Sequence, residues 1–172
     1  AIVTGTERHA GASTFAQALD WTAEVYRMAG ALMAEAGKPA GVADEGGHWP
    51  AFATNEEALA MLVRAIERAG YRPGEDAALS LDIAASEFGA DGRYVLGLER
   101  RELDRHGMIA LLVDWLDRYP IASIEDPFAE DDRVGWVAFM RACAGRVQVI
   151  GDDYLVTSAA RVDASALDHA CN

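Results

Sequence analysis

The sequence predicts an α/β fold, in the form of an incomplete (β/α)8 barrel of the TIM type. Three short apolar runs, 79–82, 121–125 and 147–152, each end in a carboxylate. A stretch with helical periodicity separates each run from the next, and such alternation places the strands parallel in one sheet. The carboxyl ends of the three runs should therefore lie at the same edge of that sheet.

Side-chain alternation within the strands favours a barrel over an open, doubly wound sheet. Ser80 and Asp82 share one face of their strand, as do Ser123 and Glu125, while aliphatic side chains occupy the opposite faces. Small polar groups suit the interior of a barrel, whereas an open parallel sheet usually has two apolar faces. The open sheet stays the alternative.

The first part of the chain predicts two helices joined by a loop. An Ala-rich stretch predicts a helix over 14–36, and a loop over 40–52 follows. The sequence Thr-Asn-Glu-Glu at 54–57 is a capping box, in which the side chains of Thr54 and Glu57 would each accept the backbone N–H of the other. The helix that it starts should end at Gly70. Its predicted buried stripe is Leu59, Leu62, Val63 and Ile66.

The rest of the chain alternates strands with helices. Asp91-Gly92, between two apolar segments, predicts a small hairpin after the first strand. Strands are expected over 77–84, 121–125 and 147–152, and helices over 102–118, 131–143 and 158–170.

Composition argues against several kinds of partner. The 172 residues carry a formal net charge of −13, whereas nucleic acids and anionic membranes attract basic surfaces. No apolar run approaches the roughly 18 residues of a membrane span. Cys143 and Cys171 lack the spacing of a zinc site or of a disulfide framework. We therefore expect a cytoplasmic protein without a membrane span or a nucleic-acid partner.

Three carboxylates at one edge of a sheet predict a divalent-cation site. Asp82, Glu125 and Asp152 end the three runs, and their hard oxygen atoms suit Mg²⁺ better than Zn²⁺. Asp126 and Asp153 directly follow two of them and are alternative ligands. Because side chains alternate along a strand, only one of each neighbouring pair should face the site, which selects Glu125 and Asp152. Any one of these acids, taken singly, would also fit a helix cap or a surface charge.

Two segments near the amino end hold further candidates. In Asp44-Glu45-Gly46-Gly47 the two glycines would let the backbone approach a ligand closely, which makes the preceding acids candidates for acid–base chemistry. The same four residues also suit an ordinary turn. His9, considered alone, is typical of a surface residue.

Four motifs together resemble the enolase family. They are Asp-Glu-Gly-Gly at 44–47, Leu-Asp-Ile-Ala-Ala-Ser-Glu-Phe at 81–88, Ser-Ile-Glu-Asp-Pro-Phe-Ala-Glu-Asp-Asp at 123–132 and Gly-Asp-Asp-Tyr-Leu-Val-Thr at 151–157. They follow the order and spacing of the family over about 14–172. The resemblance implies the barrel of the enolase C-terminal domain, with Mg²⁺ as the cofactor.

The resemblance also implies a role for each candidate residue. Asp82, Glu125 and Asp152 would hold the Mg²⁺ that binds the carboxylate of a small phosphorylated substrate. Glu45 would be the catalytic glutamate that helps the 3-hydroxyl leave, and His9 would be the substrate-binding loop histidine. The implied activity is that of phosphopyruvate hydratase, a glycolytic lyase that dehydrates 2-phosphoglycerate to phosphoenolpyruvate. Enolases commonly form homodimers or higher homo-oligomers.

The sequence also departs from the family pattern. Enolases use a lysine base on a later barrel strand, and this chain reaches Asn172 just short of that position. Its single lysine, Lys38, precedes the Asp-Glu-Gly-Gly segment, and the family's Gln-Glu-Phe strand is missing after Ser13. We therefore expect residues 1–172 to be a partial barrel domain. The N-terminal capping domain and the last barrel strands are expected to be absent from this sequence.

Two alternative functions stay open. His48 and Trp49 stand where enolases usually have other residues, in a loop where substrate would sit. One alternative is an enolase-like enzyme that acts on a related phospho- or phosphono-carboxylate. The other is a catalytically inactive enolase-like protein with a binding or structural role.

Overall fold

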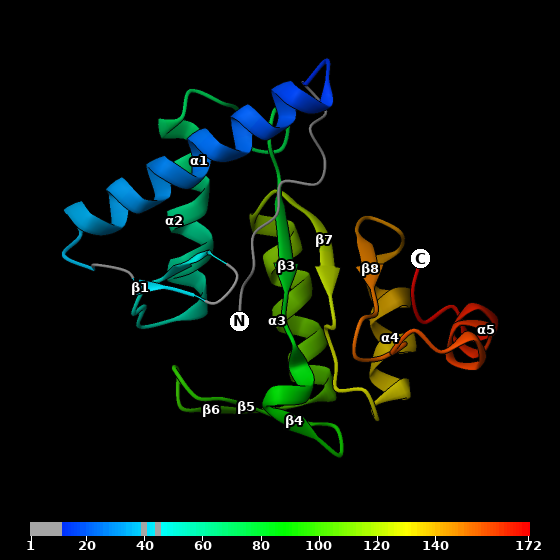
Figure 1. The fold of residues 1–172 in the computed structure, drawn as a ribbon. Helices are drawn as coiled ribbons and strands as arrows, with labels where there is room; N and C mark the ends of the chain where they lie inside the picture. The colour runs from blue at the N-terminus through cyan, green and yellow to red at the C-terminus, as the bar shows by residue number, and fades with distance from the viewer. Residues whose placement is uncertain (1–11, 39–40, 44–45) are drawn as a thin grey trace. The chain divides into compact units, whose positions relative to one another are not determined.

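The computed structural model of the chain describes residues 12–38, 41–43 and 46–172 (Figure 1). The described residues form two compact units, one ending at Leu79 and the other beginning at Ser80. No helix among them is long and apolar enough to span a membrane.

The first unit is built on two helices, α1 (Phe15–Glu35) and α2 (Asn55–Arg68), which pack against each other. The Thr14 hydroxyl accepts the Gln17 amide in the first turn of α1, and the Thr54 hydroxyl accepts the Glu57 amide in the first turn of α2. The packed faces bury Ala18, Val25, Ala29, Leu32 and Met33 of α1, and Leu59, Met61, Ala65 and Ile66 of α2.

The sequence predicted the Thr54 cap of α2 and half of its buried stripe. The Thr54 hydroxyl accepts the Glu57 amide at 3.1 Å, as a capping box requires. The Glu57 carboxylate accepts the amide of Ala53 at 2.8 Å. In the predicted stripe Leu59 and Ile66 are buried, whereas Leu62 and Val63 are only half-buried.

The predicted loop between the two helices contains a short antiparallel ladder. β1 (Gly41–Val42) pairs with β2 (His48–Trp49), with Gly41 opposite Trp49 and Val42 opposite His48. Between these two strands the structure describes Ala43, Gly46 and Gly47.

The second unit contains the sheet that the sequence predicted. β3 (Leu79–Asp82), β7 (Ile121–Glu125) and β8 (Gln148–Ile150) neighbour one another in that order. β7 and β8 are parallel, and the arrows of β3 and β7 run the same way (Figure 1). The described strands form an open parallel sheet, as part of a barrel would. Ile124 and Val149 are fully buried in it.

Three helices alternate with these strands. α3 (Arg105–Arg118) leads into β7, α4 (Arg133–Cys143) leads into β8, and α5 (Ala159–Asp168) follows β8. α3 and α4 contact each other beside the sheet (Figure 1). The βα alternation therefore confirms the predicted fold class.

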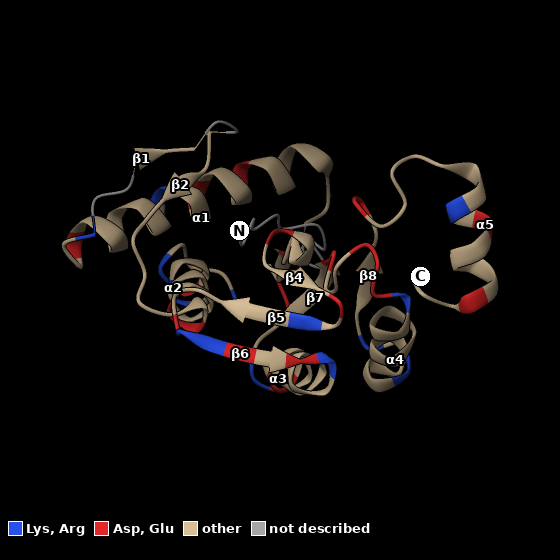
Figure 2. Ribbon diagram, turned by 90° about the horizontal axis from the view of Figure 1, so that it is seen from below, with Lys and Arg blue, Asp and Glu red and all other residues tan. Residues whose placement is uncertain are grey.

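A three-stranded antiparallel ribbon lies between β3 and α3 in the chain. β4 (Gly89–Ala90) and β5 (Arg93–Leu96) are joined by Asp91 and Gly92, with φ values of 53° and 74° that suit a type I′ turn. β6 (Arg101–Asp104) was not predicted, because its residues were assigned to the start of the following helix. They pair with β5 instead, and basic and acidic residues succeed each other along β6 (Figure 2).

Candidate metal centre

Three carboxylates gather at the carboxyl ends of β3 and β7. Asp82 is the last residue of β3, Glu125 is the last of β7, and Asp126 follows it. One oxygen atom of each lies within 4.8 Å of the other two. Oxygen ligands about 2.1 Å from one Mg²⁺ lie at most about 4.2 Å apart. A small contraction of the group would therefore let it coordinate one ion.

A pair of serines shows that β3 and β7 present the same face at this edge. Ser80 Oγ and Ser123 Oγ lie 2.5 Å apart. Each serine precedes the terminal carboxylate of its strand by two residues, and side chains two residues apart in a strand share a face. The polar face predicted from the sequence is therefore formed, with Asp82 and Glu125 at its end.

The group carries an electrostatic cost that a cation would relieve. Burial raises the pKa of the Asp82 carboxyl, the Ala84 amide bonded to it acts in the opposite direction, and the charge of Asp126 raises it further. Burial also raises the pKa of Asp126, against the effect of the backbone amides bonded to it. Partly buried carboxylates that repel one another, with oxygen atoms as the only ligands, are a donor set that fits Mg²⁺.

Asp152 lies next to this group but is not one of its three members. Its backbone amide donates to Asp126 Oδ1 at 3.0 Å, and the Asp153 amide donates to Asp126 Oδ2 at 2.9 Å. The Asp152 side chain is exposed. Among the described residues, the oxygen atoms within 4.8 Å of one another belong to Asp82, Glu125 and Asp126. Coordination by Asp152 therefore stays a prediction.

Asp126 lies in this group together with Glu125, although side chains alternate along β7, because the strand does not continue through Asp126. Asp126 has a φ of 40°, in the left-handed region, so its side chain leaves the alternation of β7. A signal for this was present in the sequence. Asp tolerates the left-handed conformation better than most residues.

The segment after Asp126 is held by a polar network that the sequence reasoning did not find. The buried Asp132 carboxylate accepts from the Tyr94 hydroxyl at 2.8 Å, from Arg105 Nε at 2.8 Å and from the Gly135 amide at 2.9 Å. The Tyr94 hydroxyl accepts the Ala129 amide at 3.3 Å. This network connects the β5 strand to the starts of α3 and α4.

The turn after β8 is held by an aromatic pair and an arginine. Tyr154 stacks on the fully buried Trp136 of α4, with ring centroids 4.3 Å apart and planes 19° from parallel. Arg161 of α5 donates to the carbonyl oxygen of Tyr154 at 3.1 Å. The backbone that carries Asp152 and Asp153 therefore leads directly into a packed segment.

Comparison with known proteins identifies the family. The family described as "Enolase, C-terminal TIM barrel domain" matches residues 8–172. The chain belongs to this family. Two relatives named "Enolase 2", from Pseudomonas syringae pv. syringae (strain B728a) and P. syringae pv. tomato (strain ATCC BAA-871 / DC3000), are each 40% identical to it over 162 residues. The matched region covers 94% of this chain and 38% of each relative, so the chain spans about two fifths of their length.

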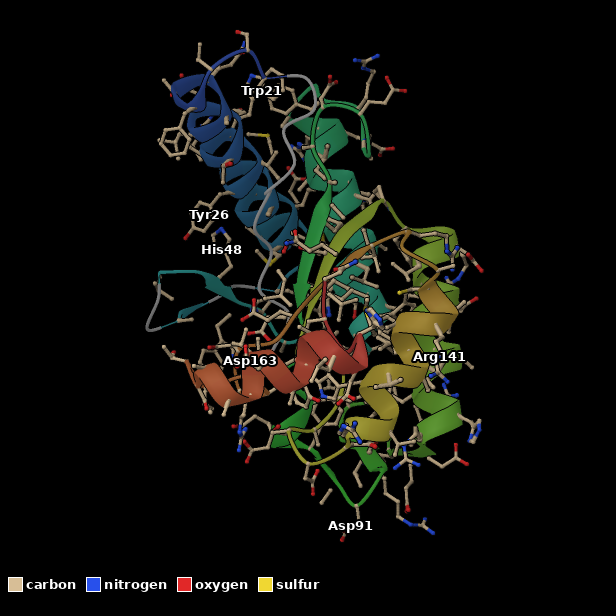
Figure 3. All side chains as sticks on the ribbon, turned by 90° about the vertical axis from the view of Figure 1, so that its right-hand side faces the viewer. Trp21, Tyr26, His48, Asp91, Arg141 and Asp163 are labelled. Carbon is tan, nitrogen blue, oxygen red and sulfur yellow. The ribbon has the colours of Figure 1, made fainter. Side chains whose placement is uncertain are left out.

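Two residues that the enolase resemblance singles out, Glu45 and His9, lie outside the described residues. Gly46 and His48, which follow Glu45 in the sequence, contact Tyr26 of α1. The Tyr26 hydroxyl donates to the carbonyl oxygen of Gly46 at 2.8 Å, and the His48 ring stacks on the Tyr26 ring at 4.1 Å (Figure 3). His48 Nε2 also lies 3.1 Å from the Tyr26 carbonyl oxygen.

Lys38 is held at the start of α2. Its Nζ atom lies 3.0 Å from a Glu57 carboxylate oxygen and donates to the Ala51 carbonyl oxygen at 3.0 Å.

Proposed function

We propose that this chain is part of a Mg²⁺-dependent enolase that dehydrates 2-phosphoglycerate to phosphoenolpyruvate, a hydro-lyase of glycolysis. The observation that supports this most directly is the group formed by Asp82, Glu125 and Asp126 at the ends of neighbouring parallel strands. Membership of the enolase C-terminal barrel family agrees with that chemistry.

Each candidate residue would have a separate role in this reaction. Asp82 and Glu125, with Asp152 as the third predicted ligand, would hold the ion. Mg²⁺ held there would supply positive charge beside the substrate carboxylate, where negative charge develops during the reaction. Glu45 would protonate the departing hydroxyl as a general acid, and His9 would contact the substrate. The base that removes the α-proton would be a lysine in a part of the protein beyond these 172 residues.

We further propose a cytoplasmic protein that assembles as a homodimer or a higher homo-oligomer, as the family resemblance implies. An enolase-like enzyme for a related phospho- or phosphono-carboxylate is the second candidate. The exposed Trp49, 68% accessible in β2 beside the segment that holds Glu45, favours it. Such a side chain could alter which substrates the loop accepts.

The experiment is an assay of phosphoenolpyruvate formation from 2-phosphoglycerate by the complete protein, with Mg²⁺ and with EDTA. Turnover that needs Mg²⁺ and is lost in Glu125→Gln, but kept in the exposed control Glu67→Gln, is the expected result. A complete, folded protein with no turnover would refute the proposal. Turnover of a phosphonate analogue alone would favour the second candidate, and Mg²⁺ binding without any turnover would favour an inactive binding protein.

A further inference from the structure

The Asp126 carboxylate lies among the candidate metal ligands, yet the backbone already uses both of its oxygen atoms. Oδ1 accepts the Asp152 amide at 3.0 Å, and Oδ2 accepts the Asp153 amide at 2.9 Å. A carboxylate that accepts amide N–H groups makes charge-assisted hydrogen bonds, which are about twice as strong as neutral ones. Coordination of an ion would compete with these bonds.

The backbone of Asp126 is held as firmly as its side chain. Its amide donates to the Ile150 carbonyl oxygen at 3.0 Å, and its carbonyl oxygen accepts the Ala85 amide at 3.1 Å. Asp126 is thus bonded to the segment after β3 on one side and to the end of β8 on the other. Asp126 therefore helps to hold the ends of these three strands together, in addition to the bond from the Ile83 amide to the Glu125 carbonyl oxygen.

Burial separates Asp126 from the other two members of the group. Asp126 is 3% exposed, whereas Asp82 and Glu125 are half-buried. Mg²⁺ loses its water reluctantly and usually keeps several water ligands. An ion that keeps water would therefore bind on the exposed side of the group, where Asp82, Glu125 and the exposed Asp152 lie.

We propose that Asp126 is a positioning residue of the metal site rather than a ligand: its carboxylate fixes the backbone of Asp152 and Asp153 so that Asp152 can complete the ligand set. This inference rests on the proposed Mg²⁺ function. The negative charge of the Asp126 carboxylate, which lies beside the ligands, would also attract the cation without coordinating it.

The first test uses the unmodified protein and amide hydrogen exchange of peptides that contain Asp152 and Asp153. With EDTA these amides exchange slowly, and addition of Mg²⁺ leaves them equally slow or slower, because Asp126 keeps both bonds. Faster exchange after Mg²⁺ addition would mean that Asp126 turns to the ion, which overturns the inference. If calorimetry detects no Mg²⁺ binding, the proposed function fails, and the exchange in EDTA still tests the contacts of Asp126.

The second test compares variants. Asp126→Asn replaces one acceptor oxygen by an amide group, so exchange at Asp152 and Asp153 should become faster in EDTA while the β5–β6 ribbon keeps its protection. Mg²⁺ affinity should fall about 10- to 100-fold, the usual effect of residues that orient metal ligands, and less than in Glu125→Gln. An Asp126→Asn variant with unchanged exchange, or with a loss equal to that of Glu125→Gln, would overturn the inference.

Discussion

Ser80 and Ser123 meet through their hydroxyl groups at 2.5 Å, each two residues before a carboxylate that ends its strand. The contact shows that Ser80 of β3 and Ser123 of β7 lie on the same face of the sheet, because side chains that touch across two strands must share a face. Asp82 and Glu125 are therefore brought together by the strands themselves, before any ion is bound.

Glu125→Gln should abolish tight Mg²⁺ binding and leave the fold intact. The substitution keeps the shape of the side chain but removes the charge that attracts the ion. We expect the affinity to fall by more than the roughly 100-fold upper range of residues that only orient ligands, as measured by titration calorimetry. Glu67→Gln, on the exposed side of α2, is the matched control. Unchanged affinity in Glu125→Gln would mean that the ligand assignment is wrong.

Asp82→Asn should stabilise the protein in EDTA at neutral pH. Burial and the charge of Asp126 raise the pKa of Asp82 in the folded state, so its ionised form opposes folding. The wild-type protein meets no such cost below the unfolded pKa of about 3.9, where the carboxyl is protonated in both states, and the cost grows as pH rises through the folded pKa.

The free energies of unfolding of wild type and Asp82→Asn should accordingly agree near pH 3 and diverge toward pH 7, as measured by urea titration in EDTA. The Asn oxygen can still accept the Ala84 amide, which keeps the local backbone bond. A variant that is less stable than wild type at pH 7 would contradict this prediction.

Tyr94→Phe should destabilise the second unit by about 1–3 kcal/mol. The change removes the hydroxyl that donates to the buried Asp132 carboxylate and accepts the Ala129 amide, so both buried groups lose a partner. Urea denaturation measures the effect. Tyr71→Phe is the control, because its ring contact with Trp21 does not need the hydroxyl. Equal stabilities of the two variants would show that the buried network contributes nothing.

Gly30→Ala should stabilise the protein without His48 and should not stabilise it with His48 present. A Cβ atom at Gly30 would lie 2.8 Å from His48 Cε1, so the ring would have to move from its stack on Tyr26. In a His48→Ala background this clash is gone, and alanine should stabilise α1 by about 1 kcal/mol through its higher helix propensity. With His48 present, crowding at a cost of about 1–3 kcal/mol should cancel or exceed this gain. A double-mutant cycle by denaturation with no coupling would refute the contact.

The sequence predicted the fold well where the spacing of apolar residues and the residues that end helices or strands indicate the same element. The strand predicted over 121–125 is the observed β7. Its apolar residues indicate a buried strand, and the proline before it, Pro120, ends the preceding helix. The start of α3 was predicted too early. Leu103 fits the apolar period of a helix, but its pairing partner Tyr94 lies in a strand nine residues earlier, and such a pairing is not visible in local periodicity.

At the site, too, the sequence predicted what depends on local strand geometry and missed what depends on contacts between distant segments. Parity brought Asp82 and Glu125 together correctly, because both lie inside regular strands. It did not predict that the Asp126 carboxylate also lies beside them, because a φ of 40° ends the regular strand geometry there. Two partners of the buried Asp132 come from elements distant in sequence, and only the folded chain places Tyr94 of β5 and Arg105 of α3 beside it.

The stack of Trp136 on Tyr154 gives the protein a built-in optical reporter. Tryptophan emission responds to whatever touches the indole ring, and this ring touches the residue two positions after Asp152. Any rearrangement of that turn on metal binding would therefore change the fluorescence of the unlabelled chain. The three remaining tryptophans, Trp21, Trp49 and Trp115, would first be replaced by phenylalanine, so that the emission comes from Trp136 and reports the turn directly.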